Sequence, residues 1–311
     1  MVNHDITLKR FQEAARVCGL IPRLCFEVVL SPTRLENAEL SIINGITQCK
    51  DLVAAISDVH GDQPVPHRAF EICPSPKSRS WEACRVRPVS DWAFHQIVAA
   101  LDRRDNDAAY RFYKAIQGTP DGAMIRGKLW ETKVHKFFSS ITRPKNFHIL
   151  SLNDRSTSFD IELSSSTVRQ NFESVQNFAG LLASFVKNEQ SCYLKLLSPT
   201  FPTFDSFLYQ HGMSQPGCQP LIGLQITDAC DHPISIKGLA DIETSLKPKV
   251  PELRSLRPTV ARKWIILFVV PEPMATSFVE QRFKDAKKSA NWGVKTTQYV
   301  LGLPEQEVMR S

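Results

Sequence analysis

Residues 202–239 decide the fold of this chain. They read Pro202-Thr-Phe-Asp205-Ser-Phe-Leu208, then, after a loop, Leu221-Ile-Gly-Leu-Gln225-Ile-Thr227, and then His232-Pro-Ile-Ser-Ile-Lys237-Gly238-Leu239. Asp205 interrupts one apolar run, and Gln225 and Thr227 interrupt the next. Because side chains alternate between the two faces of a strand, Gln225 and Thr227 share a face. An acid on one strand and a polar pair on its neighbour can converge on one place.

Strand and helix patterns alternate on both sides of this stretch. Strands are predicted at residues 147–152, 157–163, 191–197, 205–209, 221–227, 264–270 and 298–303, and helices from residue 124 onward, at 234–245 and at 278–289. The run from Trp264 to Val270 is continuously apolar, which is typical of a central strand buried on both faces. In the helix that begins near Met124, Glu131 and His135 are four residues apart and share a face. The pattern predicts an α/β (α+β) fold with a mixed β-sheet core flanked by helices.

The first 120 residues show mainly helical patterns. Helices are predicted at residues 7–18, 33–56, 92–101 and 107–117, with Ser90 as the N-cap of the third. The segment from Phe70 to Ser80 contains two prolines and is predicted to be irregular. The division therefore falls near residue 120, between a helical region (1–120) and a sheet-containing domain (121–311).

The composition of the chain narrows the possible classes of protein but does not identify a function. The chain has 311 residues, a formal net charge of +6 and a pI of about 8.9, which permits binding to a polyanion but does not require it. Its eight cysteines form no zinc-binding pattern and are expected to be reduced thiols. The start is polar, and the apolar run at 264–270 is far shorter than a membrane span. An intracellular protein without a membrane segment is expected, with the nucleus as one candidate location.

One motif match is expected to be accidental. Gly122-Ala-Met-Ile-Arg-Gly127-Lys128-Leu129 has the spacing of a nucleotide-binding phosphate loop. That loop needs a Ser or Thr after the Lys and a buried strand before the first Gly. Leu129 takes the place of the hydroxyl, and a helix and a turn precede. We therefore expect no nucleotide site in this chain.

The polar residues of the central stretch suggest metal-dependent phosphodiester cleavage. That reaction uses Mg²⁺, carboxylates that hold it, and a cation near the scissile phosphate. The PD-(D/E)xK nuclease core supplies an Asp on one strand, an acid or Gln on the next, a Lys two residues later, and often a helical Glu. In this chain these positions are Asp205, Gln225, Thr227 and Glu131. By pattern alone, a turn-capping role for Asp205 and a sheet-edge role for Gln225 stay open.

The chain from Gly127 to Leu303 resembles the restriction-endonuclease-like domain of fungal Crinkler and retrotransposon-hot-spot (RHS) type proteins. The resemblance rests on ordered blocks: Trp130-Glu131-Thr-Lys-Val-His135, Pro202-Thr-Phe-Asp205-Ser-Phe-Leu208, Leu224-Gln225-Ile-Thr227, His232-Pro-Ile-Ser-Ile-Lys-Gly238-Leu239, Trp264-Ile-Ile-Leu-Phe-Val-Val-Pro271 and Gln298-Tyr-Val-Leu-Gly-Leu303. Such proteins commonly carry a P-loop ATPase module upstream. Residues 1–120 resemble the tail of that module, without its phosphate-binding loop.

The resemblance implies a magnesium-dependent endonuclease that acts on DNA. Asp205, Glu131 and Gln225 would be the metal-binding residues, and Thr227 would occupy the position of the motif Lys. A hydroxyl offers no cation to a phosphate, so His232, Lys237 or Lys133 would have to supply one. Two other hypotheses remain: a nucleic-acid-binding or effector-like module without catalysis that uses a basic stripe at 284–295, and a protein-interaction scaffold.

Overall fold

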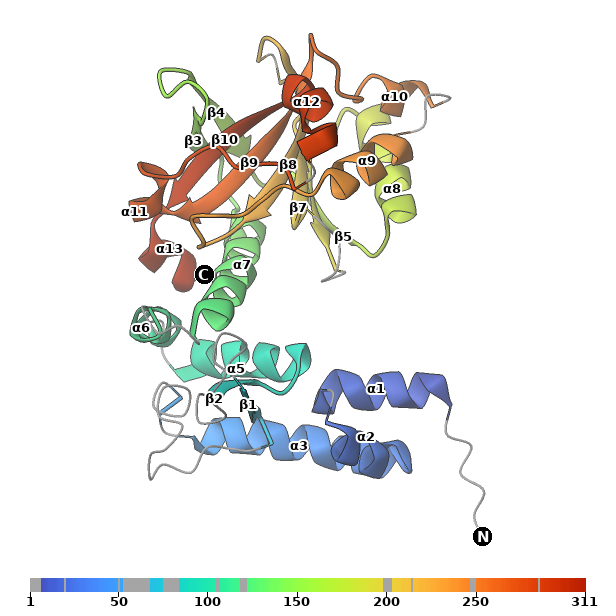
Figure 1. Cartoon of the computed structure of the whole chain (residues 1–311), viewed down its shortest axis with the longest axis vertical. Coiled ribbons are helices and arrows are strands. Elements are labelled where there is room, and N and C mark those ends of the chain that lie inside the picture. The colour runs from blue at the N-terminus through green and yellow to red at the C-terminus, as the bar shows by residue number, and fades with distance from the viewer. Residues whose placement is uncertain are drawn as a thin grey trace. The chain divides into compact units, whose positions relative to one another are not determined.

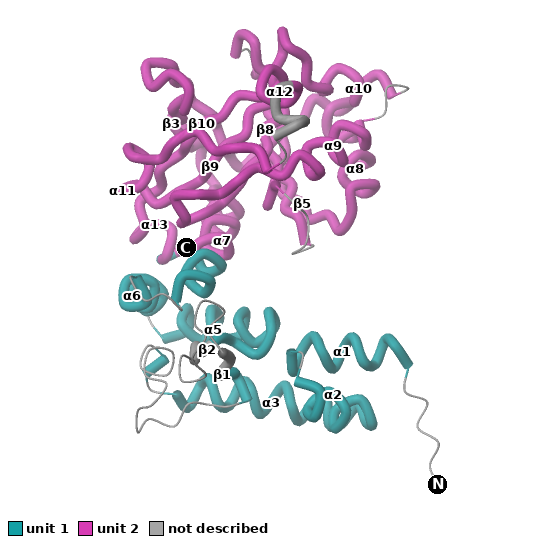
Figure 2. The backbone as a smooth tube through the Cα atoms, in the orientation of Figure 1, with its two compact units in different colours: residues 1–129, 310 teal, residues 130–309, 311 magenta. Residues whose placement is uncertain are grey.

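A computed structural model describes residues 7–19, 21–49, 51–52, 68–74, 84–104, 107–117, 122–197, 203–213, 215–246, 250–284 and 286–311. The chain divides into two compact units, residues 1–129 with Arg310 and residues 130–309 with Ser311 (Figure 2). The division lies within helix α7 (Gly122–Ser140). The residues with phosphate-loop spacing thus form the first turns of a helix. No helix in the described part of the chain has the length and apolar character needed to cross a membrane.

The first unit contains the helices expected from the sequence, a further helix that was not predicted, α2 (Pro22–Val29), and a β-hairpin. The elements are α1 (Leu8–Cys18), α2 (Pro22–Val29), α3 (Pro32–Gln48), β1 (Phe70–Pro74), β2 (Cys84–Pro88), α5 (Asp91–Arg104) and α6 (Ala108–Ala115). Thr7 and Ser90 cap α1 and α5, because their hydroxyls accept hydrogen bonds from the backbone N–H groups of Arg10 and Ala93 at 3.3 Å and 3.0 Å.

Two predictions for this unit were wrong. Residues 70–74 are not irregular, because β1 pairs with β2 in an antiparallel register that sets Phe70 opposite Pro88. Pro74 lies at the end of β1, where a missing N–H is tolerated. Helix α3 ends at Gln48 instead of continuing to 56, since Cys49 has extended backbone angles. Residues 53–56 of the predicted helix lie outside the described residues.

The second unit is built on an eight-stranded mixed sheet, so the predicted α/β fold class is confirmed (Figure 1). The strand order is β4-β3-β10-β9-β8-β7-β6-β5. The strands are β3 (Lys145–Ser151), β4 (Ser158–Leu163), β5 (Val168–Phe172), β6 (Cys192–Leu196), β7 (Ser206–Tyr209), β8 (Cys218–Ile226), β9 (Lys263–Pro271) and β10 (Thr296–Leu303). Strands β8, β9 and β10 run parallel, while β7 is antiparallel to both β6 and β8.

Helices connect the parallel strands and cover the sheet. They are α8 (Val175–Lys187), α9 (Ile236–Ser245), α10 (Pro251–Arg254), α11 (Glu272–Ala275), α12 (Ala286–Lys295) and α13 (Glu305–Met309). Helices α8 and α9 lie together on one side of the sheet (Figure 1) and share a hydrophobic core with it. The residues of β9 from Ile265 to Val270 are fully buried, as predicted for a central strand.

One predicted helix in this unit was wrong. Residues 278–284 do not form the start of a helix, because Phe283 forms a parallel bridge with Ile234 and extends the chain there. Helix α12 begins at Ala286 instead. Of the predicted basic stripe, Lys284 is exposed, and the side chains of Lys287 and Lys288 lie outside the described residues.

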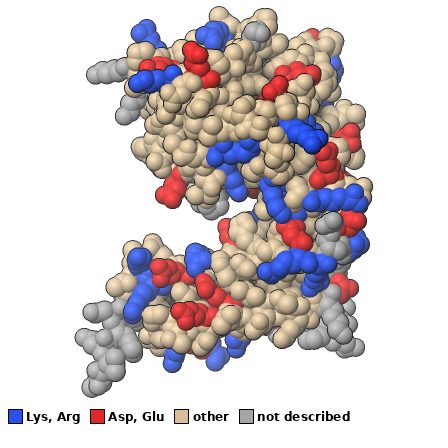
Figure 3. Space-filling view, turned by 180° about the vertical axis from the view of Figure 1, so that it is seen from behind, with Lys and Arg blue, Asp and Glu red and all other residues tan. Residues whose placement is uncertain are grey.

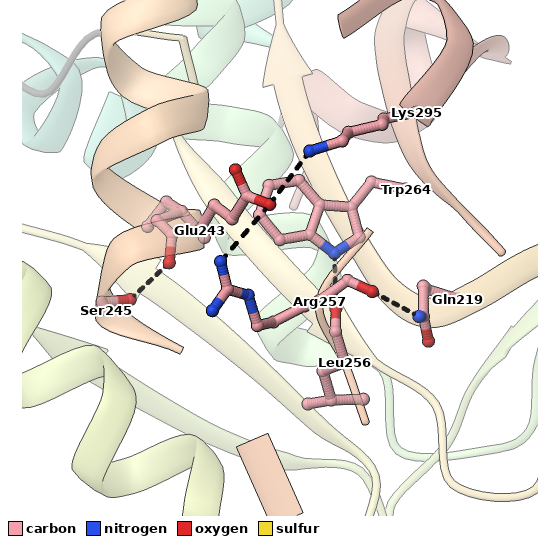
Figure 4. Close-up of polar contacts among 8 residues, drawn as sticks. Gln219, Glu243, Ser245, Leu256, Arg257, Trp264 and Lys295 are labelled. Carbon is pink, nitrogen blue, oxygen red and sulfur yellow. Dashed lines mark hydrogen bonds and ion pairs between the residues drawn. The ribbon is translucent and has the colours of Figure 1, made fainter. Parts of the chain in front are cut away.

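An ionic cluster joins α9 to α12 (Figure 4). Glu243 Oε1 accepts a hydrogen bond from Lys295 Nζ at 3.3 Å and lies 3.6 Å from a guanidinium nitrogen of Arg257. Beside it, Trp264 Nε1 donates to the carbonyl of Leu256 at 2.7 Å. One carboxylate is thus shared by two cations from separate segments.

Replacing Glu243 by Gln is expected to lower the free energy of unfolding by about 1–2 kcal/mol, because two partly buried cations lose their shared anion. Urea unfolding at low salt measures this loss. The exposed Glu162→Gln should change stability by less than about 0.5 kcal/mol. A Glu243→Gln variant as stable as the Glu162→Gln variant would show that the cluster contributes nothing.

Candidate functional site

Asp205 lies at the point where β7 begins, between β6 and β8. Its backbone N–H donates to the carbonyl of Leu224 at 2.9 Å, and its carbonyl accepts from the N–H of Leu196 at 3.2 Å. Just before it, Thr203 has a φ of 92°, a strained value for a residue other than glycine, and its hydroxyl donates to the carbonyl of Ser235 at 2.6 Å. Such strain clusters at functional sites.

The Asp205 carboxylate is held in a fixed position by β8. Gln225 Nε2 donates to Asp205 Oδ2 at 2.8 Å, and the backbone N–H of Ile226 donates to the same oxygen at 2.7 Å. The sequence prediction that the acid and the Gln converge is therefore realised. Because Gln225 points its amide nitrogen at Asp205, it orients this carboxylate in the present arrangement.

Two carboxylates repel each other at this place. Burial raises the pKa of Asp205 well above its usual range, and the negative charge of Glu131 raises it further, although the Ile226 N–H opposes the shift. The side chain of Glu131 is 44% exposed. The pair thus combines one carboxylate that is closed off from water with one that is open to it.

Helix α7 brings Glu131 to the sheet. Contacts before and after Glu131 along the chain hold the helix in place. Trp130 is completely buried, and its Nε1 donates to the carbonyl of Val269 at 3.2 Å. At the other end of the helix, the guanidinium of Arg169 donates to the carbonyls of Phe138 and Ile141 at 3.1 Å and 2.8 Å. Arg169 therefore satisfies carbonyls that the helix C-terminus leaves open.

His135 extends the site along α7 and contacts β6. Its Nε2 lies 3.8 Å from Glu131 Oε1, and its Nδ1 shares a 2.6 Å hydrogen bond with the hydroxyl of Tyr193. Burial lowers the pKa of His135, with Glu131 opposing and Lys195 reinforcing that change. Burial also raises the pKa of Tyr193; a hydrogen bond with Ser206 opposes this shift, and Asp205 and Glu131 add to it.

Lys195 lies two residues after Tyr193 on β6, on the same face. Burial lowers the pKa of Lys195, and the negative charge of Glu131 opposes this effect. Its cross-strand partner is Ser206, a buried residue whose hydroxyl lies near that of Tyr193 and lowers the pKa of Tyr193 by hydrogen bonding. A buried hydroxyl therefore lies on the same face of the sheet as Tyr193 and Lys195.

The other residues predicted for the site make other contacts or are exposed. Thr227 is buried, and its hydroxyl accepts from the N–H of Ala229 at 3.1 Å, so it stabilises a turn. The backbone N–H of His232 donates a hydrogen bond to Gln281 Oε1, and Lys284 and Asp231 are the charged neighbours of its ring. Lys237 is exposed on α9. Lys133 is buried and donates to the carbonyl of Ser311 at 2.9 Å.

Sequence reasoning missed Tyr193, Lys195 and Ser206. Lys195 had a signal, because it is the one charged residue in the apolar run from Ser191 to Leu197. Such a residue in a strand buried on both faces calls for a partner. Tyr193 and Ser206 had no comparable signal, since both residue types are common in ordinary strands.

Magnesium was expected from the sequence, and Asp205 and Glu131 are the two carboxylates that would hold it. The described chain holds no group of three or more His, Cys, Asp and Glu side chains arranged as a metal site. Mg²⁺, however, is commonly held by one or two carboxylates, with water and substrate phosphate completing its shell. Asp205 and Glu131 provide two carboxylates, and burial is the main cause of the raised pKa of Asp205, with the negative charge of Glu131 as the second cause.

Comparison of the chain with protein families, with curated proteins and with solved structures found no match. The geometry of Asp205 and its neighbours and the chemistry of their side chains are therefore what bears on function.

Proposed function

We propose that residues 130–311 form a magnesium-dependent phosphodiester hydrolase that acts on DNA, with the restriction-endonuclease-like core expected from the sequence. The observation that carries the proposal is the buried Asp205 carboxylate, oriented by Gln225 and Ile226 and repelled by Glu131. Two carboxylates pushed together are unfavourable without a cation, and functional sites are where such unfavourable arrangements are kept.

The chain's own residues would divide the work. Asp205 and Glu131 would hold the metal, and Gln225 would keep Asp205 in place. A bound Mg²⁺ would activate water and neutralise charge on the phosphate. His135 and Tyr193 would restrict the Glu131 side chain through the contacts along α7 and β6.

Cleavage of plasmid and single-stranded DNA with Mg²⁺ or Mn²⁺ tests the proposal. The wild type should cut, EDTA should stop the reaction, and Asp205→Ala should lower the rate by about 10³-fold, because a metal contributes several kcal/mol to such reactions. Asp160→Ala is the matched control, since Asp160 is exposed on β4 and its carboxylate forms a hydrogen bond with His148. Equal cleavage by both variants would refute the proposed metal site.

A second candidate is a domain that binds nucleic acid without cutting it. Thr227 favours this alternative, because it stands where the nuclease pattern has Lys and its hydroxyl is engaged in a turn. Lys and Arg side chains occur on both units, with Asp and Glu interspersed, on the side drawn in Figure 3. Salt-sensitive DNA binding by a wild type that cuts no substrate with either metal would identify this candidate.

A further inference from the structure

A single lysine extends from an apolar strand toward the helix that carries Glu131. In β6, Leu194 and Leu196 belong to the core shared with α8 and α9. Strand alternation sends Tyr193 and Lys195 to the opposite face. That face is covered by α7, as the 2.6 Å bond from the Tyr193 hydroxyl to His135 shows. Lys195 therefore extends toward the helix that carries Glu131.

One of the two carboxylates, that of Glu131, is a neighbour of Lys195. Glu131 and His135 on α7 interact with it electrostatically, and Ser206 faces it across the strand pair, one residue after Asp205. Its side chain is half-buried. The described part of the chain gives the Lys195 ammonium no hydrogen bond and no ion pair, although most partly buried lysines are paired. The cation is thus held beside the site without being used.

We propose that Lys195 contacts the scissile phosphate and supplies the cation that Thr227 cannot. The inference rests on the proposed phosphodiester hydrolysis. Water adds to phosphorus and gives up a proton, while the P–O bond to the leaving sugar oxygen breaks and that oxygen takes up a proton. Lys195 keeps its own proton throughout and stabilises the negative charge on the phosphate oxygens. The cation has moved from β8 to β6, two strands away in the sheet.

Two substitutions and one control test this role. Lys195→Met removes the charge and keeps the chain length, and Lys195→Arg keeps the charge. Lys187→Met is the matched control, because Lys187 is exposed near the end of α8. The first readout is the DNA cleavage rate with Mn²⁺, and the second is the rise in thermal midpoint that Mn²⁺ causes. Circular dichroism verifies folding, and Lys195→Gln replaces Lys195→Met if the latter does not fold.

Lys195→Met is expected to lower the cleavage rate by about 10²–10³-fold, the usual effect of removing one electrostatic stabiliser. It should keep the Mn²⁺-induced rise in thermal midpoint, because Lys195 is not a metal ligand. Lys195→Arg should keep more activity than Lys195→Met, and Lys187→Met should behave as wild type. Cleavage by Lys195→Met within threefold of wild type would overturn the inference and leave the proposed hydrolase standing.

A third readout does not depend on cleavage. In the Asp205→Asn background, the dependence of single-stranded DNA affinity on salt is compared with and without Lys195→Met. Loss of one phosphate contact should reduce the slope of log K against log salt by about 0.7. If the wild type does not cut DNA but Lys195→Met reduces the slope, Lys195 contacts a phosphate and the proposed hydrolase activity is wrong. An unchanged slope in that case would reject both.

Discussion

Replacing Asp205 by Asn is expected to raise the free energy of unfolding and to abolish cleavage at the same time. Asn keeps the size of Asp205, and its amide oxygen can still accept from Gln225 Nε2 and the Ile226 N–H. It removes the repulsion from Glu131 and the cost of burying a charge. We expect a gain of about 0.5–2 kcal/mol in EDTA, the usual size of a stabilising substitution.

Metal should reverse this order of stability. A ligand that binds the native state at 100 times its Kd stabilises it by about 2.7 kcal/mol. Mn²⁺ should therefore raise the thermal midpoint of the wild type and leave that of Asp205→Asn unchanged. Differential scanning calorimetry in EDTA and in Mn²⁺ measures both changes. A variant that gains as much from Mn²⁺ as the wild type would contradict the assignment of Asp205 to the metal.

The pH dependence of stability gives an independent test of the raised pKa of Asp205. The pKa of Asp205 is raised in the folded state, so the unfolded chain releases this proton at a lower pH than the native protein does. Between the two pKa values the native state binds more protons, and its stability falls as pH rises. The difference in unfolding free energy between Asp205→Asn and wild type, measured in EDTA, should therefore grow from about pH 4 upward. A difference that shrinks with pH would mean that the native protein holds Asp205 ionised.

The sequence was most informative where burial leaves few alternatives. The apolar run of β9 indicated a central strand because a strand covered on both faces cannot carry polar side chains. Asp205 and Gln225 stood out for the same reason, since each interrupts an otherwise apolar strand. Their meeting at 2.8 Å follows from the antiparallel pairing of β7 with β8, which brings the start of one strand to the end of the other.

What the sequence left open depends on contacts between distant segments. Residues 278–284 have a helical composition, but a bridge between Phe283 and Ile234 keeps them extended. The partner of Lys195 across the sheet became clear only with the register of β6 and β7. Lys133, Lys237 and His232 were predicted as the replacement cation, and all three lie near the motif residues in the sequence. The arrangement of the sheet instead favours Lys195 as the cation, and Lys195 lies on β6, a strand that carries none of the motif residues.

Gly223→Ala is expected to destabilise the second unit and to weaken the site together. Gly223 lies opposite Phe207 on β7, and a Cβ at this position would collide with the ring of Phe204. That ring is 2% exposed and packs against Phe207 with 5.0 Å between ring centroids, so it has little room to move. Overpacking of this kind costs about 1–3 kcal/mol. Urea unfolding measures the loss.

The collision also reaches the carboxylate of Asp205, because Phe204 immediately precedes it. Shifting the ring moves the backbone whose N–H and carbonyl fix Asp205 between β6 and β8. Cleavage by folded Gly223→Ala should therefore fall as well. Gly180→Ala is the matched control: nothing lies within 4 Å of a Cβ on this exposed residue of α8, so the change should stabilise the helix by about 1 kcal/mol.

A double-mutant cycle separates this collision from a general effect on β8. Phe204→Leu shortens the side chain that meets the new Cβ, so the Gly223→Ala, Phe204→Leu variant should be more stable than the sum of the single changes predicts. The expected coupling is about 0.5–3 kcal/mol, the range for residues in contact. Cleavage should recover in the same direction, because relieving the ring lets Asp205 return to its place beside Gln225. Additive effects on stability would show that Phe204 yields to the methyl group and that Gly223 does not control the position of Asp205.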